Sequence, residues 1–392
     1  MNKSYVILMD KVAIEAFLFS ADFGEDNYLL ASSSSSDSDS ECCCSEESSS
    51  SAENVPLKRP RVEGFAEVDV PQFSDSEFKN HFRVSRATCQ KIIELIHDDF
   101  YSDHKGGWEK ITPVKAAYIL LWYLGNRETF KLISERFKIT QSCVYNIVKV
   151  GCRNLSSKFN EYIKWPESDQ YEEESESIYE ICEIYGIIGA IGVSHIKILR
   201  PRENQEHYTN VKNYHSIAVQ GVVGHNKKFF DLYVGEGSLE PVELLQKSYL
   251  VSKAEDGFFG DYFLVGNNSY PNLPWLIIPF DNGGNLTAKQ MEFNQHHECA
   301  HRLFSNTFGQ LKARFQRLNI FENKDIPFII SCIKTVCVIH NICMDYEDDC
   351  ELFVEDDGIF IYDVEDEVVD NSDGGKRMEV FNLFLETDRT NM

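Results

Sequence analysis

The stretch that most constrains the fold of this chain is residues 189–198, which read GAIGVSHIKI. It is a short apolar run that ends in a polar turn and then restarts as a strand. Together with the nearly continuous apolar residues from 184 to 191, it is typical of a strand buried on both faces of a sheet. The sequence therefore predicts a buried central strand that leads into a hairpin.

Further signals extend this strand into a layered α/β region. Residues 214–223 alternate and then run apolar, 224–227 read as a hairpin turn, and 229–234 and 262–266 read as further strands. Helical patterns follow at 241–248, 287–315 and 326–343. Strands that alternate with helices predict a sheet covered by helices, so the fold class is α/β.

An all-helical region is expected before the sheet. A helix starts near Asp75, and another follows Pro113, which suits the first turn of a helix. Residues 129–148 read TFKLISERFKITQSCVYNIV, a pattern of helix, short turn and helix in which Thr140 caps the second helix. Leu132, Ile133 and Phe137 are expected to be buried. This layout predicts a helix-turn-helix, whose second helix can enter a major groove; the alternative is a plain helical bundle.

The predicted DNA-binding side chains lie on and around this second helix. Polar residues that would face outward are joined by basic residues that attract phosphates. The candidates are Lys131, Arg136, Lys138, Gln141, Ser142, Tyr145, Lys149 and Arg153.

The formal net charge of -25 comes almost wholly from the two ends of the 392-residue chain. Residues 1–56 carry 2 basic and 11 acidic side chains, and residues 345–392 carry 3 basic and 17 acidic ones. The middle, with 33 basic and 35 acidic, is close to neutral, so the acidity does not exclude nucleic acid as a partner of the central body. The serine- and acid-rich residues 31–53 and the acidic residues after 345 are expected to be disordered. The acidic run at 171–176 is expected to be a solvated linker.

Targeting and redox signals are few. None of the 12 cysteines forms a Cys-x-x-Cys pair, which favours reduced thiols over disulfides or a zinc site. Charged residues interrupt the apolar start of the chain, so neither a signal peptide nor a membrane span is expected there. Lys58, Arg59, Pro60 and Arg61 form a compact basic cluster that could serve nuclear import or arise by chance.

Several phrases in the same order resemble Harbinger/PIF-type transposases and the host genes derived from them. They are residues 189–196, 212–220, 234–238, 269–271, 308–315 and 340–343. The resemblance covers roughly residues 75–344 and implies an RNase H-like nuclease fold of the DDE superfamily. Together with composition and charge, it gives four expected parts: a mostly disordered Ser/acid-rich region with the basic cluster at 1–74, a helical domain at 75–165, the nuclease-like domain at 166–344 and an acidic tail at 345–392.

The family's metal site is where this sequence departs from the resemblance. In the family two aspartates and a glutamate hold divalent metal ions such as Mg²⁺, which activate water for phosphodiester cleavage. The three positions hold Gly192, Asn267 and Ser305 here, and a supporting His-Asp pair is replaced by Glu240 and Pro241. Because Mg²⁺ needs charged oxygen ligands, we expect no catalytic residues, no metal and no cofactor.

Two alternatives remain beside a protein that has lost its nuclease activity. Other acids could rebuild a metal site and give an active endonuclease; the candidates are Glu240, Glu243, Asp261 and Glu298. The chain could also be a pure protein-interaction module. In the leading hypothesis, a set of basic residues could still line a polynucleotide groove; the alternative is ordinary surface charge and histidines satisfied in the core. The residues are His195, Lys197, Arg200, Lys212, His215, Lys312, Arg314 and Arg317.

The resemblance also implies location and partners. Since the family works on genomic DNA, we expect a nuclear protein that binds DNA, chromatin or a nuclear protein. That partner could carry a Myb-like DNA-binding domain, as is common in the family. No membrane partner is expected.

Overall fold

A computed structural model of the chain describes residues 64–100, 111–281, 286–348 and 375–390. Contacts divide the chain into two units, Met1–Arg61 and Val62–Met392, and all described residues belong to the second. The predictions made for the N-terminal Ser/acid-rich region, for the basic cluster at 58–61 and for the acidic residues 349–374 lie outside the described residues.

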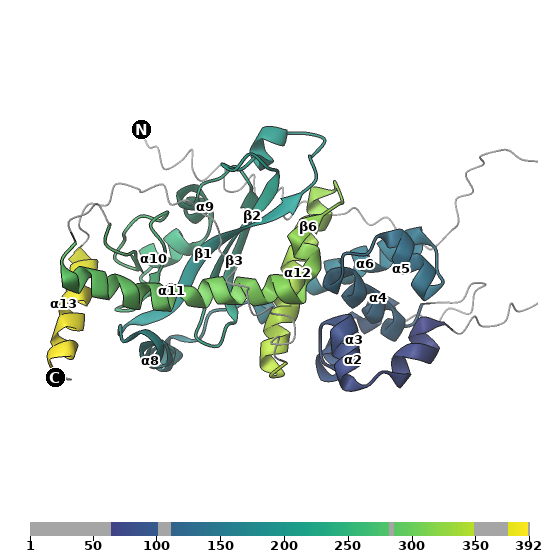
Figure 1. The fold of residues 1–392 in the computed structure, drawn as a ribbon, viewed down its shortest axis with the longest axis horizontal. Helices are drawn as coiled ribbons and strands as arrows, with labels where there is room; N and C mark the ends of the chain where they lie inside the picture. The colour runs from purple at the N-terminus through teal and green to yellow at the C-terminus, as the bar shows by residue number, and fades with distance from the viewer. Residues whose placement is uncertain (1–63, 101–110, 282–285, 349–374, 391–392) are drawn as a thin grey trace, which may run out of the picture. The chain divides into compact units, whose positions relative to one another are not determined.

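The first half of the second unit is helical, as the sequence predicts (Figure 1). Its helices, after two short turns at Phe65–Gln72, are α2 (Asp75–Phe82), α3 (Arg86–Phe100), α4 (Pro113–Gly125), α5 (Phe130–Phe137), α6 (Gln141–Ser157) and α7 (Phe159–Tyr162). Threonine or serine side chains cap α2, α4, α5 and α6 by accepting from backbone amides in the first turn. Helix α4 is buried along most of its length and packs against α3, α5 and α6.

The second half contains a six-stranded mixed sheet with the order β3-β2-β1-β4-β5, and β6 pairs with the far end of β1. The strands are β1 (Ile187–Ile198), β2 (Ser216–Val223), β3 (Phe229–Glu236), β4 (Phe263–Val265), β5 (Leu276–Ile277) and β6 (Ile320–Phe321). Strand β2 is antiparallel to both β1 and β3, whereas β4 and β6 run parallel to β1, and β5 runs parallel to β4. As predicted, β1 is the central strand.

Helices cover both faces of this sheet, which gives the predicted α/β class (Figure 1). The long α11 (Ala288–Arg314) packs across β1 and β2 on one face, while α9 (Pro241–Lys247) and α10 (Leu250–Glu255) contribute to a second apolar cluster on the other. The remaining helices are α8 (Tyr171–Cys182) and α12 (Ile326–Asp345), which packs against α6. The arrangement is consistent with the nuclease fold that the resemblance implies.

Two local predictions are wrong. The polar turn expected inside residues 189–198 does not form, because β1 continues through Ser194 and His195 and stays paired with β2 as far as Lys197 and Ser216. The acidic run at 171–176, expected to be a solvated linker, is the first half of α8. Glu174 is buried there because it accepts hydrogen bonds from the His225 backbone (2.6 Å) and side chain (2.7 Å).

The prediction of a disordered acidic C-terminal segment is wrong for residues 375–390, which form helix α13 (Gly375–Thr390). Val380, Phe381 and Phe384 are buried, and the Phe381 and Phe384 rings lie 5.6 and 5.7 Å from the ring of Phe293 on α11. An apolar stripe at helical spacing orders this segment, and the high overall acidity of the tail hides that stripe.

Helix α12 has the length and composition of a membrane span, but 72% of its most apolar 18-residue window is buried inside the protein. A mostly buried helix of this kind is typical of the core of a globular protein, where it packs against α6 and α7.

Candidate functional site

The first metal-ligand position of the family, Gly192, lies in the middle of β1 and is fully covered by α11. A Cβ atom built on Gly192 would lie 2.4 Å from two ring carbons of Phe304. Carbon atoms that touch normally stay about 3.5–4.0 Å apart, so the space that an aspartate side chain would need is filled by this phenylalanine ring. Phe304 itself is 2% exposed.

A second glycine allows the same close approach on the neighbouring strand. Gly221 on β2 pairs directly with Gly192, and a Cβ atom there would lie 3.1 Å from the ring of Phe308. The Phe304 and Phe308 rings, one helical turn apart on α11, pack together with centroids 4.7 Å apart. Two facing glycines therefore form a flat patch that lets α11 lie close to the sheet.

Hydrogen bonds fix α11 along β1 on both sides of this aromatic pair. His301 Nε2 lies 3.0 Å from the carbonyl oxygen of Ile191, and Lys312 Nζ donates to the carbonyl oxygen of His195 at 3.2 Å. Burial, with a smaller effect from the nearby Lys197, lowers the pKa of Lys312 to about 8. Side-chain packing and hydrogen bonds thus close the interface between β1 and α11, which we call the seam.

The other family positions are neutral and take part in local structure. Asn267 follows β4 in a half-buried turn, where its carbonyl accepts from the amide of Tyr270 at 3.1 Å. Ser305 follows Phe304 on α11 and is half-buried. At the start of α9, Glu240 is the N-cap residue and Pro241 occupies the first turn.

The alternative acids do not converge with these positions. The Glu243 carboxylate accepts from the amide of Glu240 at 3.0 Å in a capping box, and Glu298 pairs with Arg302 at 3.0 Å on the exposed face of α11. Asp261 is exposed before β4. Across the described ranges, no three His, Cys, Asp or Glu side chains form a group that could hold a metal ion. The aromatic and neutral residues at the family positions do not fit the divalent metal that the resemblance implies.

The predicted helix-turn-helix segment forms two helices, α5 and α6, at the expected place. Thr140 caps α6 by accepting from the amide of Cys143 at 3.2 Å, and Ile133 and Phe137 are buried as predicted. Leu132, also predicted to be buried, is 50% exposed. Five candidate DNA-binding residues have exposed side chains that form no ion pair or ring contact with the described part of the chain: Lys131, Lys138, Gln141, Ser142 and Arg153.

The three other candidate DNA-binding residues interact with side chains of the protein itself. Arg136 pairs with Glu128 at 2.9 Å and lies 4.4 Å over the ring of Trp122. Tyr145 is half-buried rather than outward-facing, since its hydroxyl donates to Asp325 at 3.4 Å. Lys149 Nζ lies 5.9 Å over the Tyr145 ring.

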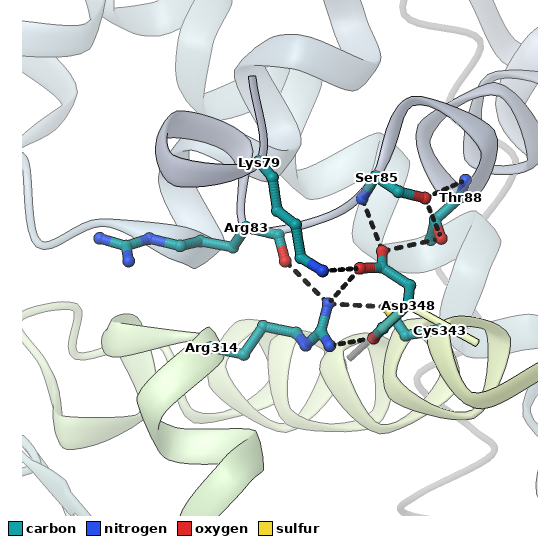
Figure 2. Close-up of polar contacts among 7 residues, drawn as sticks. All are labelled: Lys79, Arg83, Ser85, Thr88, Arg314, Cys343 and Asp348. Carbon is teal, nitrogen blue, oxygen red and sulfur yellow. Dashed lines mark hydrogen bonds and ion pairs between the residues drawn. The ribbon is translucent and has the colours of Figure 1, made fainter. Parts of the chain in front are cut away.

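Two of the basic residues predicted to line a polynucleotide groove are instead buried in the protein. Arg314 is fully buried and lies 3.5 Å from the Asp348 carboxylate, which also binds Lys79 at 2.9 Å (Figure 2). Arg317 is 3% exposed and donates to backbone carbonyls, including that of Tyr123 at 3.2 Å. Both arginines join the helical region to the sheet region.

Figure 2 shows how Asp348 is held. One carboxylate oxygen accepts from the amide of Ser85 at 2.6 Å and from the hydroxyl of Thr88 at 2.9 Å, at the start of α3. Arg314 also donates to the carbonyl of Arg83 at 2.9 Å. The sequence alone places Asp348 in an acidic tail, because nothing near it along the chain indicates partners more than 250 residues away.

Phe304 is the residue at the family site that the sequence analysis missed. The available signal was a pair of aromatic residues four apart on the helix, Phe304 and Phe308, opposite glycines on two strands. The pairing of Gly192 with Gly221 depends on strand register, which cannot be read directly from the sequence.

Comparison with known proteins agrees with this interpretation of the fold. Residues 191–341 match the sequence model of the family described as DDE superfamily endonuclease. The protein "Antagonist of like heterochromatin protein 1" of Arabidopsis thaliana is 28% identical over 71% of this chain and 76% of its own length. Protein ALP1-like of the same plant is 27% identical over 69% of this chain and 71% of its own length.

A further relative is the putative nuclease HARBI1 of Homo sapiens, 25% identical over 52% of this chain and 58% of its own length. No solved structure matches the chain. The fold and these comparisons support the interpretation of the chain as a Harbinger-type, transposase-derived protein of the DDE superfamily, with the family match at residues 191–341.

Proposed function

We propose that this protein has lost metal-dependent nuclease activity and acts in the nucleus by binding DNA, chromatin or a nuclear protein. The observation that carries the proposal is the Phe304 ring in the space of the first metal-ligand side chain. A catalytic metal needs charged oxygen ligands around one point, and an aromatic ring at that point excludes both metal and water.

The DNA-binding part of the proposal is supported by α5 and α6. Their capped, two-helix layout presents exposed Lys131, Lys138, Gln141, Ser142 and Arg153, a mixture of cations and hydrogen-bonding side chains that suits phosphates and base edges. Because Tyr145 and Arg136 interact with side chains of the protein itself, we assign DNA binding to this exposed subset.

The chromatin part is supported by a relative. The name of the Arabidopsis protein connects it to a heterochromatin protein, and the two chains share most of their length. By analogy with its transposase-derived family, the partner of this chain could be a nuclear protein with a Myb-like DNA-binding domain. A nuclear location is also supported by the basic residues at 58–61.

A nuclease assay tests the loss of activity. The full chain is incubated with supercoiled and with linear DNA in Mg²⁺ or Mn²⁺, and we expect no cleavage above a buffer control. Cleavage that is removed by Glu240→Gln or by Glu298→Gln, but not by the exposed matched variant Glu180→Gln, would contradict the proposal. It would favour the alternative of an endonuclease with a rebuilt acidic site.

Affinity purification from nuclei, with and without added nuclease, separates the two binding modes. Partners that depend on DNA disappear on nuclease treatment, whereas protein partners stay. If every partner stays and the protein does not bind duplex DNA, the chain is a pure protein-interaction module. A variant with Lys58, Arg59 and Arg61 changed to alanine tests the nuclear location. We expect its distribution to shift from the nucleus toward the cytoplasm. An unchanged nuclear distribution would mean that a partner imports the protein into the nucleus.

A further inference from the structure

The hairpin that joins β1 to β2 gathers basic residues that the seam between β1 and α11 does not use. Residues 195–215 carry four Lys or Arg side chains, Lys197, Arg200, Arg202 and Lys212, against two carboxylates, Glu203 and Glu206. All four basic residues are exposed, and we call the segment 195–215 that carries them the basic hairpin. Figure 1 shows the hairpin extending beyond the sheet at the end of β1 and β2.

The base of the hairpin is held in one shape. Thr209 forms a bridge with His215, and the amides of Lys212 and Tyr214 donate to the side-chain oxygen of Asn210 at 3.1 and 3.2 Å. The Lys197 ammonium lies 5.0 Å over the ring of Tyr214, which fixes it above the same turn. A held turn reduces the cost of ordering the loop when these cations bind a ligand.

A half-buried cation lies at the base of this turn. Lys312 of α11 reaches the carbonyl of His195 at the base of the hairpin. Burial lowers the pKa of Lys312, and Lys197 lowers it further; burial also lowers the pKa of His195 to about 4, with Lys312 and Lys212 adding to the effect. Lys197 and Lys212 of the hairpin thus lie close enough to Lys312 and His195 to act on their pKa values.

Cations that repel one another lower the stability of the folded protein, and an anion bound among them removes part of that cost. We propose that the basic hairpin binds phosphate groups of a duplex DNA backbone, as a second contact surface in addition to α6. This inference rests on the proposed function, since it adds a surface to a DNA-binding protein. The four cations exceed the three carboxylates at the hairpin, Glu203, Glu206 and Glu236, the last of which lies 3.0 Å from His207. Duplex DNA is favoured over an acidic protein because its backbone presents closely and regularly spaced charges, and because α6 is proposed to bind the same ligand.

Lysine footprinting tests the two surfaces at once. The full chain is acetylated with a water-soluble reagent, with and without a random duplex of roughly 30 base pairs, and each lysine is quantified by mass spectrometry. We expect DNA to protect Lys197 and Lys212 together with Lys131 and Lys138, because bound phosphates cover their ammonium groups. Exposed Lys164 and Lys247 should react as before. Protection of Lys131 and Lys138 alone would overturn this inference and leave the proposed function standing, whereas protection of no lysine would overturn both this inference and the DNA-binding part of the proposed function.

A charge-neutralising variant provides the second measurement. Lys197→Gln with Lys212→Gln is compared with Lys164→Gln with Lys247→Gln, which removes the same charge elsewhere. Each phosphate that the protein no longer neutralises reduces the slope of log affinity against log salt by about 1, so the slope should fall by about 2 for the hairpin variant and hardly at all for the control. Equal slopes would refute the inference, as would binding of a polyglutamate peptide by the hairpin in place of DNA.

Discussion

Replacing Gly192 by alanine should destabilise the protein, although alanine is the smallest side chain that can be added. The new Cβ would lie 2.4 Å from ring carbons of Phe304, so the ring or the α11 backbone has to move. Overpacking of this kind typically costs about 1–3 kcal/mol. Replacing glycine also restricts the unfolded chain, which stabilises the folded state by about 0.4–1 kcal/mol. The free energy of unfolding should therefore fall by roughly 1–2 kcal/mol.

A mutant cycle separates steric overlap from other effects. Phe304→Ala alone should cost about 3–5 kcal/mol, because it removes a buried aromatic ring. In the double variant the alanine at 192 occupies part of the space that the ring leaves. The two single losses should therefore sum to more than the loss of the double variant, by about 1 kcal/mol or more.

Urea unfolding followed by circular dichroism measures these free energies of unfolding, with the midpoint and slope fitted separately. Gly64→Ala is the control, since its new Cβ would meet its nearest neighbour at an ordinary 3.4 Å and should change the free energy of unfolding little. Strict additivity of the Gly192 and Phe304 variants, or a neutral Gly192→Ala, would refute the steric account of the lost metal site. Gly192→Asp should lower the free energy of unfolding more than Gly192→Ala does. The difference should be larger at high pH, because the variant buries an ionised carboxylate without a cation partner.

Three further results are expected. His225→Gln should lower the free energy of unfolding more at pH 5.5 than at pH 8.5, as measured by urea unfolding. The hydrogen bond with Glu174 raises the pKa of His225 in the folded protein. The stability that His225 contributes is therefore full below its unfolded pKa of about 6.5 and is lost as pH rises through the raised folded pKa. Asp348→Asn should cost about 3–5 kcal/mol at neutral pH. Burial tends to raise the pKa of Asp348, but Arg314, the Ser85 amide and Lys79 lower it overall, so the difference from the native protein should shrink as pH falls through that lowered value. Neutralising the acidic residues of 349–374 and deleting 1–56 should raise affinity for random duplex DNA, most at low salt, in a fluorescence-polarisation titration; equal affinities would show that the acidic ends do not compete with phosphates.

The elements that the sequence predicted well are those with strong local signals. Helices α4, α6, α11 and α12 begin at capping residues or at a first-turn proline and carry apolar faces, so their starts lie close to the predicted ones. Helix α6, however, continues to Ser157, beyond the predicted pattern that ends at residue 148. Strands β2 and β3 were indicated by alternation around a short turn. The two-residue strands β5 and β6 have no such pattern, and tertiary pairing alone defines them.

The candidate site was predictable only in part, for a physical reason. Substitutions at 192, 267 and 305 could be read along the chain, because each is the property of one position. The residue that fills the space of the missing side chain could not be read from the sequence, since Phe304 reaches Gly192 from a helix more than 100 residues further along the chain. The long-range hydrogen bonds of Asp348 with Ser85 and Thr88 were missed for the same reason.

These interactions change what the loss of the metal ligands means. If the aspartate alone had been lost, β1 and α11 would border a polar, hydrated gap that a reversion at position 192 could use again. Instead Gly192 and Gly221 form a flat patch, Phe304 and Phe308 pack onto it, and hydrogen bonds from His301 and Lys312 to β1 carbonyls hold α11 on either side. Burial of the two rings contributes stability on the order of a few kcal/mol, and a restored metal site would have to displace it. Helix α11, which carries Ser305 at the third ligand position of the family, is therefore part of the core, as the proposed binding role requires.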